Sequence, residues 1–367
     1  MTQDVIVIGA GIIGLATAER LLTQGATVTI LERNQVGKES SWAGGGILSP
    51  LCPWDYPDEV TNLTRYSASL FPAWVAALHQ TTGINCEYET SGILVLPPYD
   101  IQMAQHWCAT HGMETKQNLP PHSVFANNEL GIYGNKTPEH SLFLPEIAQV
   151  RSPRLLHALH NQVTALGGQI VEHCSVSNIA VKNERVQSLA TTGGKFNANR
   201  YIVSAGAWSK EILGQYALNL DIKPIRGQML LFKFDTPPIR TIFLQNDLYI
   251  IPRQDGHLLI GSTLEDVGFD KRTTETVRND LFKRAQAVLP FLRDRQILQH
   301  WAGLRPASPH NIPTIGKHPF LENLYINSGH FRYGVTMAPA SAEILLNEMT
   351  GNPQPIDTNP YQTGWRN

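Results

Sequence analysis

The sequence predicts an α/β part and an α+β part that fold as two interleaved domains. In residues 4–33 a strand, a glycine turn, a helix and a second strand follow one another, and similar α/β pieces recur near 150–210 and 320–350. Short strands with frequent turns lie between these pieces, which indicates a mixed, largely antiparallel sheet in the second domain. The first domain is expected to be Rossmann-like.

Composition excludes several classes of protein. The chain has 367 residues and a net charge of −2, so it offers no basic field for nucleic acid or an anionic membrane. No stretch reaches the roughly 18 apolar residues of a membrane span, and the N-terminus lacks the basic region of a signal peptide. A cytoplasmic protein is therefore expected.

No metal site is expected either. The cysteines form no CxxC pair, which speaks against zinc and against a disulfide framework. His157 and His160 lie three residues apart on a predicted helix, but they have no third ligand in the pattern. The four cysteines are Cys52, Cys86, Cys108 and Cys174.

The opening unit contains a glycine fingerprint. Gly9, Gly11 and Gly14 form G-x-G-x-x-G between the apolar run that ends at Ile8 and a stretch of good helix formers. The first glycine permits a tight turn, the second lets the backbone approach a pyrophosphate, and the third lets the helix pack close to the sheet. The N-terminus of the helix then attracts phosphates. Glu32 ends the second strand, where an acid binds a ribose hydroxyl, and this predicts a dinucleotide with an unphosphorylated ribose.

The fingerprint alone does not distinguish NAD from FAD. Directly after the second strand, "ESSWAGGGILSP" places Ser40 and Ser41 before three consecutive glycines, Gly44 to Gly46. Small residues and exposed backbone N–H groups suit a second approach to a diphosphate or to the edge of a flat ring. This segment favours FAD over NAD.

The remaining elements are expected as follows. Helices are predicted at about 55–80, 150–172 and 274–292, and a last helix is predicted to begin near Ala338–Pro339. Strands are predicted in "CEYETSGILVLPP", "NRYIVSAGAWS", "QMLLFKF", "LYIIPR", "HLLIGST" and "LYINSGH".

Six segments resemble the glycine oxidase and D-amino acid oxidase family of flavoproteins, most of all the bacterial glycine oxidases of thiamine biosynthesis. They span nearly the whole chain in the family's order: "VIVIGAGIIGLATAERLLTQGATVTILE", "SSWAGGGILSP", "YIVSAGAWS", "LYIIPR", "HWAGLRPASPHNIPTIG" and "GHFRYGVTMAPASAEIL". The resemblance implies noncovalent FAD, a substrate site floored by the antiparallel sheet, and a homo-oligomer. No cysteine follows Cys174, which argues against a cysteine-linked flavin, while a histidine link stays open.

The resemblance also implies a division of the chain. Residues 1–83, 148–218 and 301–367 are expected to form the FAD-binding domain, and residues 84–147 and 219–300 the substrate-binding domain.

Three candidate catalytic residues follow from the same resemblance. Arg305 corresponds to the arginine that binds the substrate carboxylate, Tyr249 to the tyrosine that assists it, and Arg332 to the arginine of "GHFR", expected at the rim of the substrate pocket. The expected cofactor-binding residues are Gly9, Gly11, Ile12, Ile13, Gly14, Glu32, Arg33, Ser40, Ser41, Ala43, Gly44, Gly45, Gly46, Val176, Ala205, Gly206, Trp208, Gly329, His330, Arg332, Tyr333 and Gly334.

Several of these residues also fit structural roles. Arg305 could support a proline turn, and Tyr249 could be an ordinary strand aromatic. Glu265 and Asp266 fit a polar turn better than a catalytic pair, and His330 fits a packed histidine better than a base. The chain departs from the family at Tyr333, where an asparagine is common, and in the loop "CPWDYPDEV".

The implied reaction is oxidative deamination of glycine, small D-amino acids or N-methylglycine, by hydride transfer to the flavin. The products are a 2-oxo acid and ammonia, and dioxygen yields hydrogen peroxide. Such a transfer needs a fixed carboxylate and a neutral amine, but no side-chain base. Two alternatives stay open: a D-amino acid dehydrogenase that feeds a quinone or a carrier, and a tRNA-modifying flavoprotein, which the weak acidity disfavours.

Overall fold

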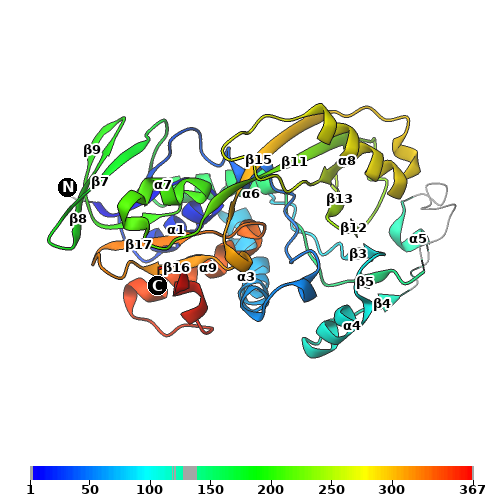
Figure 1. Cartoon of the computed structure of the whole chain (residues 1–367), viewed down its shortest axis with the longest axis horizontal. Coiled ribbons are helices and arrows are strands. Elements are labelled where there is room, and N and C mark those ends of the chain that lie inside the picture. The colour runs from blue at the N-terminus through cyan, green and yellow to red at the C-terminus, as the bar shows by residue number, and fades with distance from the viewer. Residues whose placement is uncertain (1–2, 118, 120, 127–138, 366–367) are drawn as a thin grey trace.

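The structure is a computed structural model that describes residues 3–117, 119, 121–126 and 139–365. Two large sheets lie side by side along the long axis of the molecule (Figure 1). Each sheet takes strands from separate parts of the chain, so the predicted α/β plus α+β fold class is confirmed. No helix within the described ranges is long and apolar enough to cross a membrane.

The first sheet has six strands, in the order β16-β17-β10-β1-β2-β6. They pair in parallel except β16, which is antiparallel at one edge. The central strand reads as an apolar run because both of its faces are covered. The bounds are β1 (Gln3–Ile8), β2 (Val28–Leu31), β6 (Gln169–Val171), β10 (Ala198–Val203), β16 (Thr314–Lys317) and β17 (Leu324–Ser328).

Different layers cover the two faces of this sheet. Val5 and Val7 point into a core shared with four helices, whereas Ile6 and Ile8 point into a core shared with a small sheet of three strands. The helices are α1 (Ile12–Thr23), α3 (Asp58–Thr82), α6 (Ser152–Ala165) and α9 (Gly334–Thr350). The small sheet comprises β7 (Val176–Lys182), β8 (Arg185–Thr191) and β9 (Gly194–Phe196).

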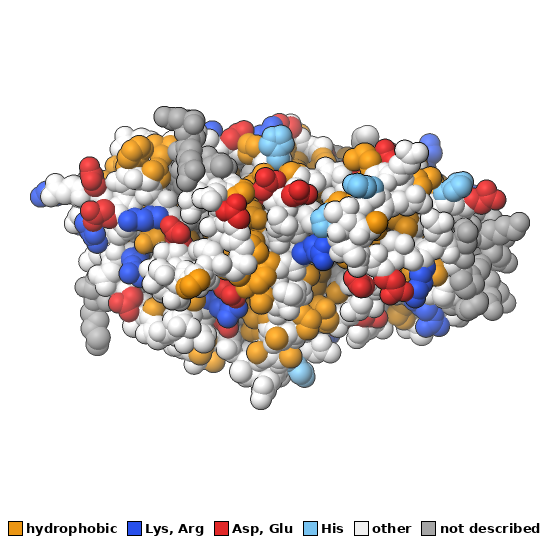
Figure 2. All heavy atoms as spheres, turned by 90° about the horizontal axis from the view of Figure 1, so that it is seen from below, with side chains coloured by type: hydrophobic (Ala, Val, Ile, Leu, Met, Phe, Trp, Pro, Cys, Tyr) orange, Lys and Arg blue, Asp and Glu red, His pale blue; other side chains and the backbone are white. Residues whose placement is uncertain are grey.

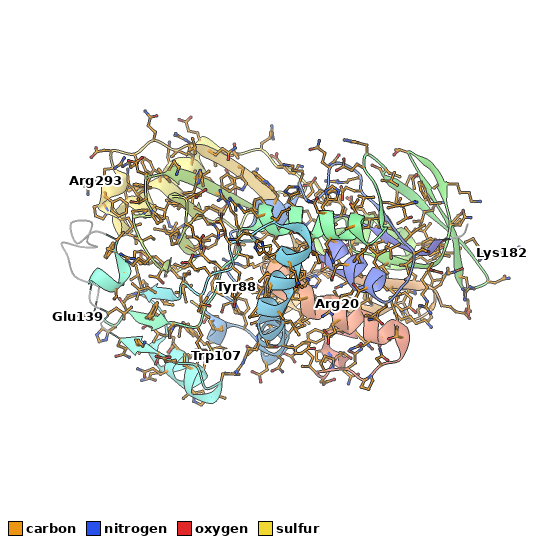
Figure 3. The ribbon with its side chains drawn as sticks, turned by 180° about the vertical axis from the view of Figure 1, so that it is seen from behind. Arg20, Tyr88, Trp107, Glu139, Lys182 and Arg293 are labelled. Carbon is orange, nitrogen blue, oxygen red and sulfur yellow. The ribbon has the colours of Figure 1, made fainter. Side chains whose placement is uncertain are left out.

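A polar contact joins three of these helices at their outer edge. Arg20 of α1 forms an ion pair of 2.8 Å with Glu343 of α9, and Figure 3 shows Arg20 beside that helix. Tyr66 of α3 donates a hydrogen bond of 2.7 Å to the same carboxylate.

The second sheet has eight strands, in the order β15-β11-β14-β13-β12-β3-β5-β4. Its neighbours are antiparallel except for β12 and β3, which pair in parallel, so the sheet is mixed and largely antiparallel, as predicted. The bounds are β3 (Ile93–Leu96), β4 (Lys116–Gln117), β5 (Leu142–Leu144), β11 (Lys223–Lys233), β12 (Ile242–Gln245), β13 (Leu248–Pro252), β14 (His257–Gly261) and β15 (Gln299–Ala307).

The alternation of side chains along β13 separates the two faces of this sheet. Leu248 and Ile250 pack in the core beneath α8 (Glu275–Val288). Tyr249 and Ile251 point to the opposite face, where they meet residues of the loop after β2 and of α4 (Ile101–Thr110). This second face therefore looks toward the first sheet's glycine-rich loops.

Short elements complete the fold. They are the helices α2 (Ser40–Ala43), α5 (Pro121–Val124) and α7 (Ser209–Leu213), and the 3-10 turns η1 (Pro53–Asp55), η3 (Gly206–Trp208), η4 (Gly214–Ala217), η5 (Pro290–Leu292), η6 (Pro309–Asn311) and η7 (Asn359–Trp365).

The helices predicted at about 55–80 and 274–292 are confirmed within a few residues. The helix predicted at 150–172 is confirmed only as far as Ala165, because residues 169–171 form β6, and the predicted start of the last helix is wrong. α9 begins at Gly334, and Pro339 lies inside it. Proline is tolerated there because its missing N–H removes only one bond, and the buried small residues around it hold the helix. The division into domains stays a prediction, and its boundary at residue 301 falls within β15.

Candidate active site

The turn between β1 and α1 brings the helix close to the sheet. Gly9 has a φ of +106°, and a Cβ there would lie 2.6 Å from the Ser204 carbonyl oxygen. A Cβ on Gly14 would lie 1.9 Å from the Gly9 carbonyl oxygen. Only glycine fits either position, because a Cβ atom at either one would collide with a carbonyl oxygen. The absence of side chains therefore lets the turn and the helix pack closely against the neighbouring backbone.

The N-terminus of α1 faces the loop after β2. Gly11 caps the helix without any side-chain bond, and the backbone N–H of Ile12 donates to Ser41 Oγ at 3.0 Å. Ser41 belongs to α2, so one of the two serines singled out in the sequence meets the glycine turn directly. The dipole of α1 is aimed at this meeting point, which suits an anion.

Glu32 lies at the end of β2 and is only 7% exposed. One of its carboxylate oxygens accepts from the Ala10 N–H at 2.8 Å, and the other from the Asn34 N–H at 2.9 Å. A carboxylate has about four acceptor positions. Glu32 is thus fixed by backbone groups and keeps the capacity to accept hydroxyl donors.

Beyond Glu32, aromatic and charged side chains form a stack. The guanidinium carbon of Arg33 lies 3.4 Å from the centroid of the Trp208 ring, and Phe269 stacks on Trp208 at 5.4 Å. Arg33 pairs with Glu39 at 2.6 Å, and Lys271 pairs with Glu39 at 3.1 Å. The segment between β14 and α8 therefore reaches across to the edge of the first sheet.

The loop of three glycines is held by a buried arginine. Arg253, at the end of β13, donates to the Gly45 carbonyl oxygen at 2.6 Å and to Gln149 Oε1 at 2.7 Å. Burial lowers the pKa of Arg253 to about 10, so it remains charged at neutral pH. A Cβ on Gly45 would lie 2.6 Å from Ile251 Cδ1, and one on Gly46 would lie 2.1 Å from the Val150 carbonyl oxygen. The loop is thus pressed against the second sheet.

Arg305 and Tyr249 stand together on the second sheet. Arg305 donates to the Thr263 carbonyl oxygen at 2.9 Å and to Ser262 Oγ, and it lies directly over Gly227. Burial lowers the pKa of Arg305, while Tyr249 acts in the opposite direction. The Tyr249 hydroxyl donates to Met229 Sδ at 3.2 Å. Tyr249 is therefore buried, Arg305 is partly buried, and the two side chains are fixed and adjacent.

The segment before α9 closes the same space. Phe331 has a φ of +42°, an unfavourable value for a bulky residue, and it separates His330 from Arg332. His330 Nε2 lies 2.9 Å from Ser341 Oγ, and burial lowers its pKa to about 3, so its ring is neutral at neutral pH. The ring of Tyr333 meets that of Tyr56 edge-on at 5.2 Å, which places the loop "CPWDYPDEV" against the site.

One continuous cavity joins these features, with about 1370 Å³ of free space including its open part. Most of the predicted residues line it: Gly9, Gly11, Ile12, Ile13, Glu32, Arg33, Ser40, Ser41, Gly44, Gly45, Gly46, Val176, Ala205, Gly206, Trp208, Tyr249, Arg305, His330, Arg332, Tyr333 and Gly334.

Three predicted residues lie outside the lining. Gly14 packs under the glycine turn, and Ala43 contacts the backbone of β15. The Gly329 carbonyl accepts a hydrogen bond of 2.5 Å from the Ser308 hydroxyl. These three support the walls of the cavity. Glu265 is also outside it, paired with Arg226 at 2.6 Å.

Comparisons with known proteins agree with this geometry. Residues 4–347 match the family described as "DAO: FAD dependent oxidoreductase". The chain belongs to this family. A curated glycine oxidase from Pseudomonas aeruginosa is 38% identical over all of both chains. A solved glycine oxidase from Bacillus cereus ATCC 14579 is 26% identical, with a TM-score of 0.87 and 95% of each chain covered. One from Geobacillus kaustophilus has a TM-score of 0.91 at 24% identity, covering 98% of this chain and 97% of the other, and supports the fold.

This FAD-dependent oxidoreductase of the amino acid oxidase type has room and partners for its cofactor. Four buried polar atoms of lining residues have no hydrogen-bond partner within the described part of the chain, and two of them, Ser204 Oγ and Asn327 Oδ1, belong to the first sheet's side of the cavity. A buried polar atom without a hydrogen-bond partner is rare in proteins unless a ligand forms that hydrogen bond. Together with the glycine turn, Glu32 and the serines of α2, they fit a dinucleotide that lies along the cavity.

Sequence reasoning missed part of this FAD-dependent oxidoreductase's lining. The missed residues are Ile8, Leu31, Glu39, Ile47, Ser49, Leu51, Cys174, Ser204, Ile212, Pro306, Asn327, Ser328, Phe331, Val335 and Thr336. Several of them follow or end β10 and β17. Ligands bind outside the carboxyl ends of parallel strands, so the strand order would have revealed these positions.

Proposed function

We propose that the chain is a glycine oxidase that deaminates glycine and small D-amino acids to a 2-oxo acid and ammonia, and N-methylglycine to a 2-oxo acid and methylamine. The observation that carries this proposal is the fixed, adjacent pair of Arg305 and Tyr249 in a cavity whose other walls fit FAD. A guanidinium binds a carboxylate with two parallel hydrogen bonds, and a neighbouring phenol adds a third. The 38% identity to a glycine oxidase over the full length supports the same assignment.

The surroundings of Arg305 suit it to bind a substrate carboxylate. Its guanidinium is held from behind by Thr263 and Ser262, so its remaining N–H groups keep a fixed direction. A carboxylate held there places the neighbouring amine and carbon in one orientation, which lowers the entropic part of the barrier. Bound FAD supplies the hydride acceptor, and dioxygen then takes the electrons as hydrogen peroxide.

The substrate amine is expected to lose its proton to water. Within the described lining the carboxylates are Glu32 and Glu39, and both belong to the end formed by β2 and α2. His330 is neutral and faces Ser341, so it is a poor proton acceptor. The wall formed by Ile47, Leu51 and Tyr333 limits water around the reacting carbon, and the released imine is hydrolysed by water afterwards.

The test is direct. The purified protein is expected to be yellow, to release its flavin in acid, and to lose its flavin absorbance rapidly when glycine is added without oxygen. A panel of small D-amino acids and N-methylglycine extends the test. No bleaching by any of these amines would refute the proposal.

Air distinguishes the acceptors. One equivalent of peroxide for each equivalent of glycine consumed supports the oxidase, whereas fast bleaching without peroxide indicates a dehydrogenase. A tRNA-modifying role has no support from the face seen in Figure 2, where acidic and basic side chains are interspersed.

The proposal includes a homo-oligomer in the cytoplasm with noncovalent flavin. Light scattering on the eluted protein measures its mass, and recovery of all flavin in the acid supernatant tests for a covalent link. Whether the reaction serves thiamine biosynthesis or D-amino acid catabolism stays a prediction.

A further inference from the structure

Arg332 faces the cavity without an anionic partner. Its Nη2 atom is buried and has no hydrogen-bond partner within the described residues. The same residues contain no carboxylate within ion-pair distance of its guanidinium. Removing one partner of a buried ion pair is costly because it leaves the other charge uncompensated. The guanidinium of Arg332 resembles such a charge whose partner is missing.

The surroundings of Arg332 do not neutralise it. Burial lowers its pKa, whereas Tyr333, Tyr56, Tyr249 and Asp247 raise it, so that the group stays protonated. Phenols carry no charge at pH 7. Asp247 forms an ion pair with Arg284, which compensates its charge. The guanidinium of Arg332 therefore needs an anion from outside these groups.

A second uncompensated arginine shares the cavity. Arg305 bonds to a carbonyl and a hydroxyl, both neutral, and the charge of Arg332 lowers its pKa. When Arg305 takes both oxygens of one substrate carboxylate in a two-pronged contact, Arg332 Nη2 still has no partner within the described residues. The glycine turn and the N-terminus of α1, where phosphates are expected, lie on the first sheet, away from the second-sheet residues around Arg305.

We propose that Arg332 binds a second acidic group of the substrate, so that the site prefers amino acids with two carboxylates. The second carboxylate is carried either on the amine nitrogen, as in iminodiacetate, or on the side chain, as in D-aspartate. This inference rests on the proposed function, because it assigns the first carboxylate to Arg305.

Binding of unreactive acids tests it without turnover. Diglycolate and methoxyacetate both carry an ether oxygen in place of the amine, and diglycolate has one carboxylate more. Titration of the flavin absorbance of the holoenzyme is expected to show diglycolate binding about 10–100-fold more tightly, as a charge-assisted hydrogen bond allows. In Arg332→Gln this preference disappears, and in Arg332→Lys it shrinks but persists.

Arg293→Gln serves as the matched control, because Arg293 is exposed and lies far from the cavity, at the end of the molecule labelled in Figure 3. It is expected to keep the full preference for diglycolate. Equal affinity of the wild-type protein for the two acids overturns a second carboxylate on the amine nitrogen, even if no variant retains FAD, and a kcat/KM for D-aspartate no higher than that for glycine overturns one on the side chain. Equal weakening of both acids in Arg332→Gln also overturns the proposal, and a shifted flavin reduction potential would then identify Arg332 as a counter-charge to the reduced flavin.

Turnover identifies the class of substrate. The kcat/KM for iminodiacetate or D-aspartate is expected to exceed that for glycine at least ten-fold, and Arg332→Gln is expected to lower it at least ten-fold more than it lowers that for glycine. The better of the two diacids shows where the second carboxylate is attached. Oxidation of glycine without any diacid preference overturns the inference and leaves the proposed function standing, whereas no reduction by any amine overturns the proposed function.

Discussion

The two ends of the cavity balance their charges differently. At the end formed by β2 and α2, Arg33 and Lys271 both pair with Glu39, and Glu32 accepts two backbone N–H groups. At the end formed by the second sheet and the segment before α9, Arg305 and Arg332 have no carboxylate partner within the described residues.

This difference indicates how each end recognises its ligand. Where the protein supplies both members of an ion pair, the surface is complete before the ligand arrives, and recognition relies on shape and hydrogen bonds. Where it supplies only cations, the ligand must bring the anion, because a buried unpaired charge is unfavourable. Four changes test the comparison, from the largest expected effect to the smallest.

Arg305→Ala removes the main cation of the second end. We expect kcat/KM for glycine to fall by about a thousand-fold, because breaking a buried charge pair costs about 3–5 kcal/mol. Steady-state kinetics measure this, and the flavin released in acid shows that FAD is still bound. An unchanged kcat/KM in the FAD-loaded variant would remove Arg305 from the substrate site.

Arg253→Gln releases the loop that lies between the two ends. The Gly45 carbonyl and the Gln149 amide oxygen each lose a buried donor, which costs about 1–3 kcal/mol per unsatisfied group. We expect the Kd for FAD to rise about 10–100-fold, measured by flavin fluorescence on reconstitution. Arg253→Lys, which keeps the charge but not the two-pronged geometry, should fall in between. Wild-type affinity in both variants would contradict a positioning role.

His330 tests the electrostatics through pH. Burial lowers its pKa to about 3 in the folded protein, whereas an unfolded histidine titrates near 6.5. Below about pH 6.5 the unfolded state binds a proton that the folded state does not. The free energy of unfolding should therefore fall as the pH falls toward 3, by up to about 1.4 kcal/mol per pH unit from this group.

Urea unfolding of the holoenzyme at several pH values between 4 and 6.5 measures that slope. In His330→Gln the slope should be smaller by the contribution of one histidine. A slope identical to that of the wild-type protein would show that His330 titrates normally in the folded state.

Glu39→Gln should have the smallest effect, because its partners Arg33 and Lys271 are partly exposed. Exposed ion pairs contribute about 0–1 kcal/mol and are screened by salt. We expect the Kd for FAD to change by less than about five-fold. The change should shrink at 0.5 M salt, because the Debye length falls toward about 3 Å as the salt concentration approaches 1 M. A hundred-fold loss of affinity for FAD would mean that the charges at the end formed by β2 and α2 are not balanced by the protein alone.

The features that the sequence predicts are those formed by residues close together along the chain. The glycine turn, Glu32 and the paired serines lie within one βαβ unit and the loop that follows it, so spacing alone locates them. The start of α9 was misplaced because proline usually stands in the first turn of a helix, whereas here Pro339 lies deep in a buried helix.

What the sequence misses depends on long-range contacts. Arg253 meets Gly45 from 208 residues away, and Thr263 meets Arg305 across two strands of the second sheet. Asn327 enters the cavity because β17 pairs with β10, a fact of strand order. No local pattern contains these contacts, so only the folded chain identifies the supporting residues.

The central claim, that the second end recognises its ligand through a carboxylate, is tested most directly with glycine and glycinamide. The two molecules share the amine and the reacting carbon and differ in the charge of one group. Mixed with the holoenzyme without oxygen, glycine should bleach the flavin rapidly and glycinamide at least a hundred-fold more slowly. Equal rates with both amines, or no bleaching by glycine, would contradict the account.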